Sequence, residues 1–298
     1  MTSDAAQAHP ITPADGVAVV GLGKMGLPMA RHLRAAGFRV VGFDPSEACQ
    51  ERAAALGIEL AATAAHAAAS TAAALVVVGF DEQAIEVISD PERGLLAGAR
   101  AGFIIAMCST VQTSTSVQMA KVAEEIGVVV VDATLCLGEP AAEDATLLIM
   151  CGGPTTALDR LQPALSVVGR DIYRLGDVGA GQVGKMLNNY LLWNSVVANY
   201  EALRLGGRLG LDLEALRQSL MLSSGNNWAL ETWLRPRPMP WAEKDMRILL
   251  DHADEAGVPM PGAGVTREEI KRIKQVKNVG LDGQRDSSSM DDFTRAHL

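Results

Sequence analysis

Two groups of residues have the types and spacing to carry chemistry, and the first is a glycine-rich stretch. Gly21, Gly23 and Gly26 follow the apolar run 17–20, and Asp44 ends a second apolar run 44 − 21 = 23 residues after Gly21. In dinucleotide-binding folds, such glycines allow a tight turn, close approach of a pyrophosphate and close packing of the next helix. An acid about 20 residues further on binds the ribose hydroxyls. The pattern predicts a bound dinucleotide; the alternative is a glycine-rich turn without a cofactor.

The expected cofactor contacts follow from this placement. A helix beginning in the loop presents N–H groups and the positive end of its dipole to phosphates. Asp44 would repel a 2′-phosphate, and the residues after it, 45–47, include no arginine to accommodate one. We therefore expect NAD, with NADP less favoured. The loop residues that we assign to cofactor binding are Gly21, Leu22, Gly23, Lys24, Met25 and Gly26.

The second group is a lysine beside two amides. Lys185 and Asn189 are four residues apart and share one face of an expected helix, with Asn188 beside them. Lys185 lies in the first turns of that helix, where the dipole disfavours a cation. A lysine placed against this preference suggests a proton donor or acceptor. The alternative is a lysine whose ammonium reaches solvent along an apolar helix face.

The pattern of apolar runs indicates how these groups are positioned. Strands alternate with helices up to about residue 175, which predicts a doubly wound parallel sheet. After that point the patterns are helical. We expect a flexible tail at 1–14, a dinucleotide-binding Rossmann domain at 15–178 and an all-α substrate and oligomerisation domain at 179–298. Expected strands are 17–20, 40–43, 58–62, 75–79, 103–107, 128–132, 146–151 and 171–175; the long helix runs from about 181 to 209, and the tail from 280 is expected to be loosely ordered.

Composition narrows the possible partners. The 298 residues carry a net charge of −9, which argues against nucleic acid and anionic membrane surfaces. The four cysteines form no C-x-x-C pair and the five histidines are scattered, so we expect no metal site. The stretch 60–80 is uncharged, but its alanines and polar residues favour a small helix and a strand over a membrane span. Residues 1–15 lack the features of a signal peptide, so we expect a cytoplasmic location.

Three segments carry a resemblance to a known family. They read GLGKMGLPMARHL from residue 21, GDVGAGQVGKMLNN from residue 176 and EKDMRILLDHADEAGVPMP from residue 243. The chain resembles the β-hydroxyacid dehydrogenase family, which includes 3-hydroxyisobutyrate dehydrogenases and tartronate semialdehyde or glyoxylate reductases, over roughly residues 17–280. The resemblance implies hydride transfer between a nicotinamide and a small hydroxy acid or the matching semialdehyde.

The resemblance also implies roles for particular residues. Lys185 would be the catalytic lysine and Asn189 a substrate ligand. Ser109 and Thr110 would lie near the nicotinamide, with Thr110 also near the substrate. Lys244 would lie near the cofactor, with Asp245 supporting the site. We also count Phe80 among the cofactor-binding residues.

One motif departs from the family. The substrate loop of relatives reads like DAPVSGGxxGAxxGTL, whereas here Cys136 replaces the serine and Leu137 the next glycine, with Ala141 and Ala145 at two further glycines. A thiol forms weaker hydrogen bonds than a hydroxyl, and leucine restricts the backbone. We still assign Cys136, Leu137 and Gly138 to substrate binding, with altered substrates. A reactive thiol and a buried structural thiol are both compatible with Cys136.

Two alternatives to a hydroxy acid oxidoreductase stay open. Imine reductases share this fold, but they usually lack a lysine at the position of Lys185. A module that binds the dinucleotide without turnover would explain the altered loop. As partners we expect a small hydroxy acid or aldehyde and a second copy of the chain. Family members are commonly homodimers or homotetramers, and the long helix is apolar on most faces, at Leu191, Trp193, Val196, Val197, Tyr200 and Leu203.

A pair of arginines precedes the Lys244–Asp245 pair. Arg235 and Arg237 alternate with prolines, which stiffen the backbone and present the side chains. Relatives tend to have an aromatic residue near the position of Arg237. A guanidinium suits bidentate contact with a carboxylate, so one hypothesis is that Arg237 binds an anionic group of the substrate. The other is a solvated surface loop whose arginines pair with acidic residues.

Overall fold

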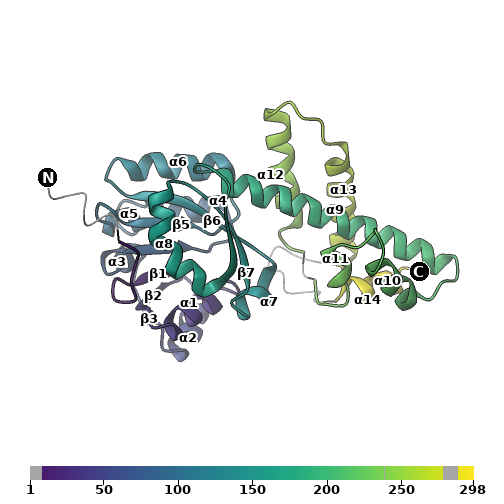
Figure 1. The fold of residues 1–298 in the computed structure, drawn as a ribbon, viewed down its shortest axis with the longest axis horizontal. Helices are drawn as coiled ribbons and strands as arrows, with labels where there is room; N and C mark the ends of the chain where they lie inside the picture. The colour runs from purple at the N-terminus through teal and green to yellow at the C-terminus, as the bar shows by residue number, and fades with distance from the viewer. Residues whose placement is uncertain (1–8, 238, 278–287) are drawn as a thin grey trace. The chain divides into compact units, whose positions relative to one another are not determined.

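The structure is a computed structural model that describes residues 9–237, 239–277 and 288–298 (Figure 1). The chain divides into two compact units, Met1–Lys185 and Met186–Leu298. The division falls inside one continuous helix, α9 (Ala180–Arg208). Each unit is described by itself below.

The first unit is built on one eight-stranded sheet of order β3-β2-β1-β4-β5-β6-β7-β8. Neighbouring strands pair in parallel except β6 and β7, which are antiparallel. This confirms the doubly wound sheet and corrects the expectation that it is wholly parallel. The strands are β1 (Val17–Val20), β2 (Val40–Phe43), β3 (Glu59–Leu60), β4 (Ala73–Val76), β5 (Ile104–Met107), β6 (Val129–Cys136), β7 (Leu147–Gly152) and β8 (Gly169–Arg174).

The length of β6 explains the antiparallel pair. We expected this strand to end at Asp132, but it continues for four more residues to Cys136. Only residues 137–146 then separate it from β7. A parallel return needs a crossover of a dozen or more residues, so the chain turns back beside β6 instead. Asp132 therefore lies in the middle of a buried strand.

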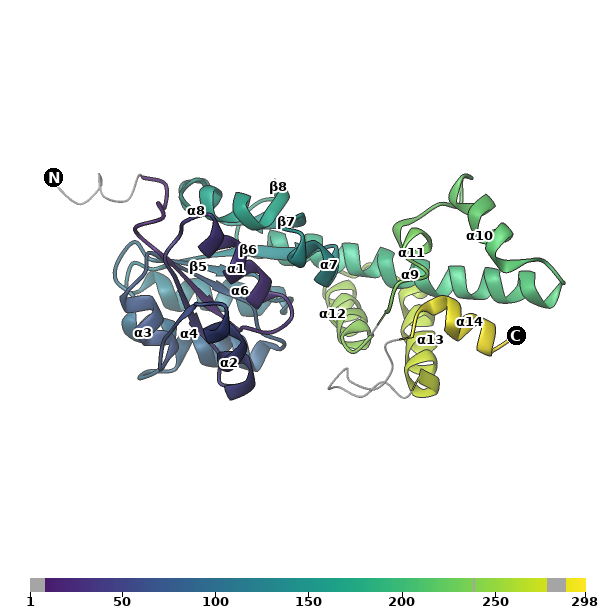
Figure 2. The same ribbon diagram turned by 90° about the horizontal axis from the view of Figure 1, so that it is seen from below.

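Helices cover both faces of the sheet (Figures 1 and 2). Val17 and Val19 of β1 pack into one apolar cluster with residues of α1 and α8, while Ala18 and Val20 pack into a second with residues of α3, α4 and α6. Burial on both faces explains the uninterrupted apolar strands. The helices are α1 (Gly26–Ala35), α2 (Glu47–Ala55), α3 (Ala64–Ala69), α4 (Asp81–Ser89), α5 (Leu95–Gly98), α6 (Thr113–Glu124), α7 (Gly138–Glu143) and α8 (Thr155–Val168).

The described part of the second unit is helical. It contains most of α9, then α10 (Leu213–Met221), α11 (Trp228–Glu231), α12 (Ala242–Glu255), α13 (Pro261–Lys277) and α14 (Met290–Ala296). None of the helices in the described ranges combines the length and apolar character that crossing a bilayer requires.

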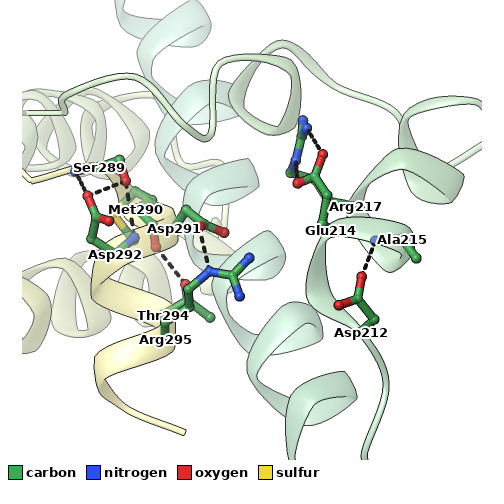
Figure 3. Close-up of polar contacts among 10 residues, drawn as sticks. All are labelled: Asp212, Glu214, Ala215, Arg217, Ser289, Met290, Asp291, Asp292, Thr294 and Arg295. Carbon is green, nitrogen blue, oxygen red and sulfur yellow. Dashed lines mark hydrogen bonds and ion pairs between the residues drawn. The ribbon is translucent and has the colours of Figure 1, made fainter.

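Helix α14 corrects part of the expectation of a loose tail. The Ser289 hydroxyl and the Asp292 carboxylate form a reciprocal capping box at its start, and Arg295 pairs with Asp291 at 2.7 Å (Figure 3). Phe293 is buried on its inner face. Such a box satisfies two backbone donors of the first turn, and Asp212 caps α10 in a related way. Residues 278–287, also expected to be loose, lie outside the described residues.

The apolar faces of α9 are largely covered within the chain. Trp193, Val196, Val197, Tyr200 and Leu203 are buried, whereas Leu191 is 64% exposed. Packing within the chain therefore buries five of the six apolar side chains that led us to expect an assembly surface on this helix. The helices of the second unit supply more cover than the sequence pattern alone indicated.

Candidate active site

The glycine loop has the geometry that its sequence predicted. Gly21 follows β1 with φ +96°, and a Cβ there would clash with the Val77 carbonyl oxygen. A Cβ on Gly26 would clash with the Gly21 carbonyl oxygen, whereas a Cβ on Gly23 would meet nothing within 4 Å. Packing therefore requires the first and third glycines. The second borders open space, and α1 starts beside it without a side-chain cap.

Asp44 holds this loop in place. Its Oδ2 atom accepts a hydrogen bond from the Leu22 N–H at 2.7 Å, and its Oδ1 atom accepts one from the Ser46 N–H at 2.8 Å. The residue is 9% exposed. Each carboxylate oxygen has two lone pairs, so both keep capacity for a ribose hydroxyl. The role of Asp44 as a clamp on the loop was not part of the sequence prediction.

Ser109 stabilises the ends of two neighbouring strands. Its hydroxyl accepts a hydrogen bond from the Val78 N–H at 2.8 Å and donates one to the Val76 carbonyl at 3.2 Å. Because β1, β4 and β5 run parallel, their carboxyl ends share one edge of the sheet, the edge at which open α/β sheets bind ligands. Thr110 and Phe80 are half-buried at this edge.

Gln182 is a residue that the sequence analysis missed. Its side-chain NH₂ donates to the Ser109 carbonyl at 2.9 Å, and its Oε1 atom accepts from the Val111 N–H at 3.2 Å. It is buried one helical turn before Lys185. Gln182 thus ties the start of α9 to the segment after β5. In the sequence, only its position in GQVGK, three residues before Lys185, could have pointed to this role.

Asp132 anchors the start of α9 from the centre of β6. Its Oδ2 atom accepts hydrogen bonds from the Gly179 N–H at 2.6 Å and the Gly181 N–H at 3.1 Å. Burial raises the pKa of this carboxyl, opposed by the neighbouring Ser116 hydroxyl and by backbone N–H groups including those of Gly179 and Gly181. A carboxylate at a helix start also complements the dipole.

These anchors place Lys185 beside the end of β6. Its Nζ atom lies 4.0 Å from the Cys136 Sγ atom at the end of β6. Lys185 is half-buried and Cys136 is 2% exposed. The structure thus brings together the predicted catalytic lysine and one predicted loop residue. The Lys185 side chain is held within the first unit, at the sheet edge that also carries the glycine loop.

The loop keeps left-handed turns without the glycines of relatives. Leu137 has φ +77° and Gly138 has φ +71°, and Ala145 has φ +54°. A left-handed conformation costs a non-glycine residue roughly 1–2 kcal/mol. The Leu137 side chain packs on the core cluster of the first unit, which contains Leu135 and Ala141. Packing of the leucine offsets the backbone strain, so Leu137 contributes its backbone rather than its side chain to this edge.

The remaining predicted residues lie in the second unit. Asn189 is buried, and its Oδ1 atom accepts a hydrogen bond from the Asn188 side chain at 3.1 Å. Asp245 is buried and accepts a hydrogen bond from the Trp193 indole at 3.1 Å. The Lys244 ammonium lies 5.6 Å from the centre of the Trp241 ring. The Trp193–Asp245 contact joins α9 to α12 and was not predicted.

The two arginines differ from each other. Arg235 is exposed, whereas Arg237 is buried. The hypothesis of a solvated surface loop is therefore wrong for Arg237. The prolines around it gave no signal of burial, because burial depends on packing between segments that are distant in sequence.

Comparison with known proteins decides the family. Residues 16–176 match the NAD-binding domain of 6-phosphogluconate dehydrogenase, and residues 179–290 match the NAD-binding domain of NADP-dependent 3-hydroxyisobutyrate dehydrogenase. The 2-(hydroxymethyl)glutarate dehydrogenase of Eubacterium barkeri is 34% identical over 82% of this chain and 84% of its own length. The chain belongs to the β-hydroxyacid dehydrogenase family. It is an NAD-dependent oxidoreductase, as expected from the glycine loop and Lys185.

Other relatives agree with this placement. The 3-hydroxyisobutyrate dehydrogenase of Pseudomonas aeruginosa is 37% identical over 73% of this chain and 72% of its own length. A solved 3-hydroxyisobutyrate dehydrogenase of Mycobacterium tuberculosis with L-serine has a TM-score of 0.83 at 25% identity, over 95% of this chain and 99% of that one. An imine reductase of Myxococcus stipitatus, at 15% identity and a TM-score of 0.64 over 95% of this chain and 99% of that one, shares the fold alone. The higher identity of the hydroxy acid dehydrogenases thus favours the β-hydroxyacid dehydrogenase family over the imine reductases.

Proposed function

We propose that the chain oxidises a small β-hydroxy acid to its semialdehyde, or catalyses the reverse reduction, with Lys185 as the general acid–base. The observation that carries the proposal is the position of Lys185 Nζ beside Cys136. This pair lies at the same sheet edge as the glycine loop, whose middle glycine borders open space. A proton-transferring group and a cofactor loop at one edge are the two components that the reaction needs.

The chain's residues handle the proton and the orientation of the substrate. NAD, when bound, supplies the hydride chemistry. In oxidation, Lys185 Nζ as a neutral amine removes the proton of the substrate hydroxyl. In reduction, the ammonium returns that proton to the developing alkoxide. Gln182 and Asp132 hold the first turns of α9 and so fix where Nζ lies.

The substrate contacts are part of the proposal. Cys136, Leu137, Gly138 and Thr110 would bind the substrate from the first unit. Asn189 lies one helical turn after Lys185 in α9 and would orient the substrate, with Asp245 and Arg237 as further ligands. Relatives are named for 2-(hydroxymethyl)glutarate, L-serine and 3-hydroxyisobutyrate. All three compounds contain HOCH₂–CH(R)–COO⁻, and we propose this grouping as the substrate class.

The proposed function also includes the contacts with the cofactor. We propose that residues 15–178 bind NAD and that residues 179–298 serve substrate binding and assembly. Gly21, Leu22, Gly23, Lys24, Met25 and Gly26 would face the diphosphate, and Asp44 the ribose. Phe80, Ser109, Thr110 and Lys244 would lie along the nicotinamide half. The Asp44 charge supports a preference for NAD over NADP, because a 2′-phosphate would approach a carboxylate.

We also propose that the chain is a homodimer or homotetramer. Several large apolar side chains of the second unit stay exposed, among them Leu205 at 61%, Leu209 at 73% and Leu222 at 92%. Leu209 lies one turn after Leu205, just past the end of α9, since its N–H donates a hydrogen bond to the Leu205 carbonyl. Exposed apolar side chains grouped in this way mark an interaction surface. Light scattering at micromolar concentration tests this, since a mass of 31.4 kDa would mean a monomer.

A cytoplasmic location is the last element of the proposal. Cys49, Cys108, Cys136 and Cys151 are free thiols. Burial raises the pKa of Cys151 to about 12, which keeps this thiol unreactive. Free thiols are the form that a reducing compartment maintains.

Absorbance of reduced NAD tests the proposed function directly. A panel of HOCH₂–CH(R)–COO⁻ compounds is supplied with NAD, and the matching semialdehydes with reduced NAD. Turnover of at least one compound, dependent on Lys185, supports the proposal. Binding of NAD with no turnover across the panel in either direction would contradict it.

A further inference from the structure

Arg237 is a buried cation with an unused hydrogen-bond donor. It follows α11, and its side chain is 8% exposed. Its Nη2 group donates to the hydroxyl and the carbonyl oxygen of Thr232, and its guanidinium lies 5.4 Å from the centre of the Trp228 ring. Within the part of the chain that the structure describes, its Nε atom is buried without a hydrogen-bond partner. Thr232 and Trp228 are both neutral.

The missing component is a negative charge. Among residues 9–237, 239–277 and 288–298, no carboxylate forms an ion pair with Arg237. Burial lowers the pKa of Arg237 to about 10, and the neighbouring charge of Arg235 acts in the same direction. The guanidinium is nevertheless protonated at neutral pH. A desolvated charge without a counter-ion is costly, and an aromatic ring compensates it only in part.

The chemistry of the Arg237 guanidinium indicates which ligand it would bind. A guanidinium binds a carboxylate through paired, charge-assisted hydrogen bonds. We propose that Arg237 binds a second carboxylate of the substrate, so that the preferred substrate is a dicarboxylic β-hydroxy acid, HOCH₂–CH(R)–COO⁻ with R ending in COO⁻. The inference rests on the proposed function, which supplies the first carboxylate and the hydroxyl.

Matched substrates test this without any mutation. 2-(Hydroxymethyl)glutarate and 2-(hydroxymethyl)pentanoate have the same head group and arm length and differ only in the terminal carboxylate. The expected kcat/KM of the wild type with NAD is at least tenfold higher for the dicarboxylate, mostly through KM. Equal kcat/KM values, or a preference for the pentanoate, would show the inference wrong and leave the proposed function standing.

Variants locate the effect. Arg237→Gln should remove the preference for the dicarboxylate, and Arg237→Lys should keep part of it, because an ammonium retains the charge but not the fork of donors. Arg235→Gln is the matched control, two residues away and exposed. It should leave the preference within about twofold at physiological salt. A preference that survives Arg237→Gln in a folded protein would contradict the assignment.

Binding of a non-reacting dianion separates this inference from the proposed function. Glutarate should raise the unfolding temperature of the wild type, butyrate should not, and Arg237→Gln should abolish the shift. This readout decides the inference even if no substrate is oxidised. Asp282 and Asp286 lie outside the described residues, so Asp282→Asn/Asp286→Asn is the remaining control. Stabilisation by glutarate in this double variant but not in the wild type would mean an internal partner, and would overturn the inference.

Discussion

The Lys185 Nζ atom lies 4.0 Å from the Cys136 Sγ atom, and Cys136 stands at the loop position where the family's motif has a serine. A thiol is a weak acceptor, so this contact restrains the Lys185 side chain only weakly. The backbone that carries Lys185 is held instead by the hydrogen bonds of Gln182 and Asp132 at the start of α9. Gln182 and Asp132 therefore fix the position of Lys185, while Lys185 itself would transfer the proton.

The two outer glycines of the loop and the middle one should respond differently to mutation. Gly21→Ala should lower the free energy of unfolding by about 3 kcal/mol or more, because the new Cβ clashes with the Val77 carbonyl in a left-handed backbone. Gly23→Ala should leave stability within about 0.5 kcal/mol and weaken NAD binding, since its Cβ points into open space. Urea unfolding and calorimetric titration with NAD measure the two effects. Equal losses of stability would contradict this division.

Asp44→Asn should relax the choice of cofactor. The amide oxygen still accepts the Leu22 N–H bond that holds the loop, but the charge that repels a 2′-phosphate is gone. The ratio of kcat/KM for NADP over NAD should rise about tenfold, equivalent to about 1.4 kcal/mol. Glu47→Gln, an exposed acid at the start of α2, is the charge-matched control. An unchanged ratio in Asp44→Asn would remove Asp44 from discrimination.

Sequence reasoning was strong where the determinants are local. The glycine loop, the strands on either side of it and Lys185 on α9 each follow from residues within one or two turns. The antiparallel return at β7 depends on the length of β6, which the apolar run to Asp132 underestimated. The Gln182 bridge needed a partner 73 residues away, at Ser109. Contacts of this kind leave no periodic signal.

The burial of single polar side chains could not be predicted from the sequence either. Arg237 stands in a proline-rich segment whose composition is typical of a solvated loop, yet packing against Thr232 and Trp228 removes it from water. Leu137 was expected to contact substrate because of its place in the loop motif. Its left-handed backbone could not be foreseen, because leucine seldom adopts it.

Leu137 offers a test of that strain. Both Leu137→Ala and Leu137→Gly lose the leucine packing, but glycine also relieves the φ of +77°. Leu137→Gly should therefore unfold with a free energy about 1 kcal/mol higher than Leu137→Ala, the reverse of the order in an ordinary helix or strand. Urea denaturation of the two variants gives the difference. A more stable alanine variant would mean that the turn is not left-handed in solution.

Stability should depend on pH through Asp132. Burial raises the pKa of this carboxyl in the folded state above its ordinary value of 3.8. The folded state then binds the proton more tightly than the unfolded chain, so this contribution to stability is present below about pH 3.8 and is lost as pH rises through the folded pKa. Asp132→Asn keeps an acceptor for Gly179 N–H and should remove this decline. Urea unfolding at several pH values would contradict the assignment if both proteins lost stability equally from acid to neutral pH.

The measurement closest to the central claim is turnover by Lys185→Ala. With NAD and the best HOCH₂–CH(R)–COO⁻ substrate, kcat should fall by roughly 10²- to 10⁴-fold, the usual contribution of a general acid–base. NAD affinity should stay unchanged, and added methylamine should restore part of the rate. Lys121→Ala, an exposed lysine on α6, should behave as the wild type. Near-wild-type kcat in a folded Lys185→Ala protein would remove Lys185 from the mechanism.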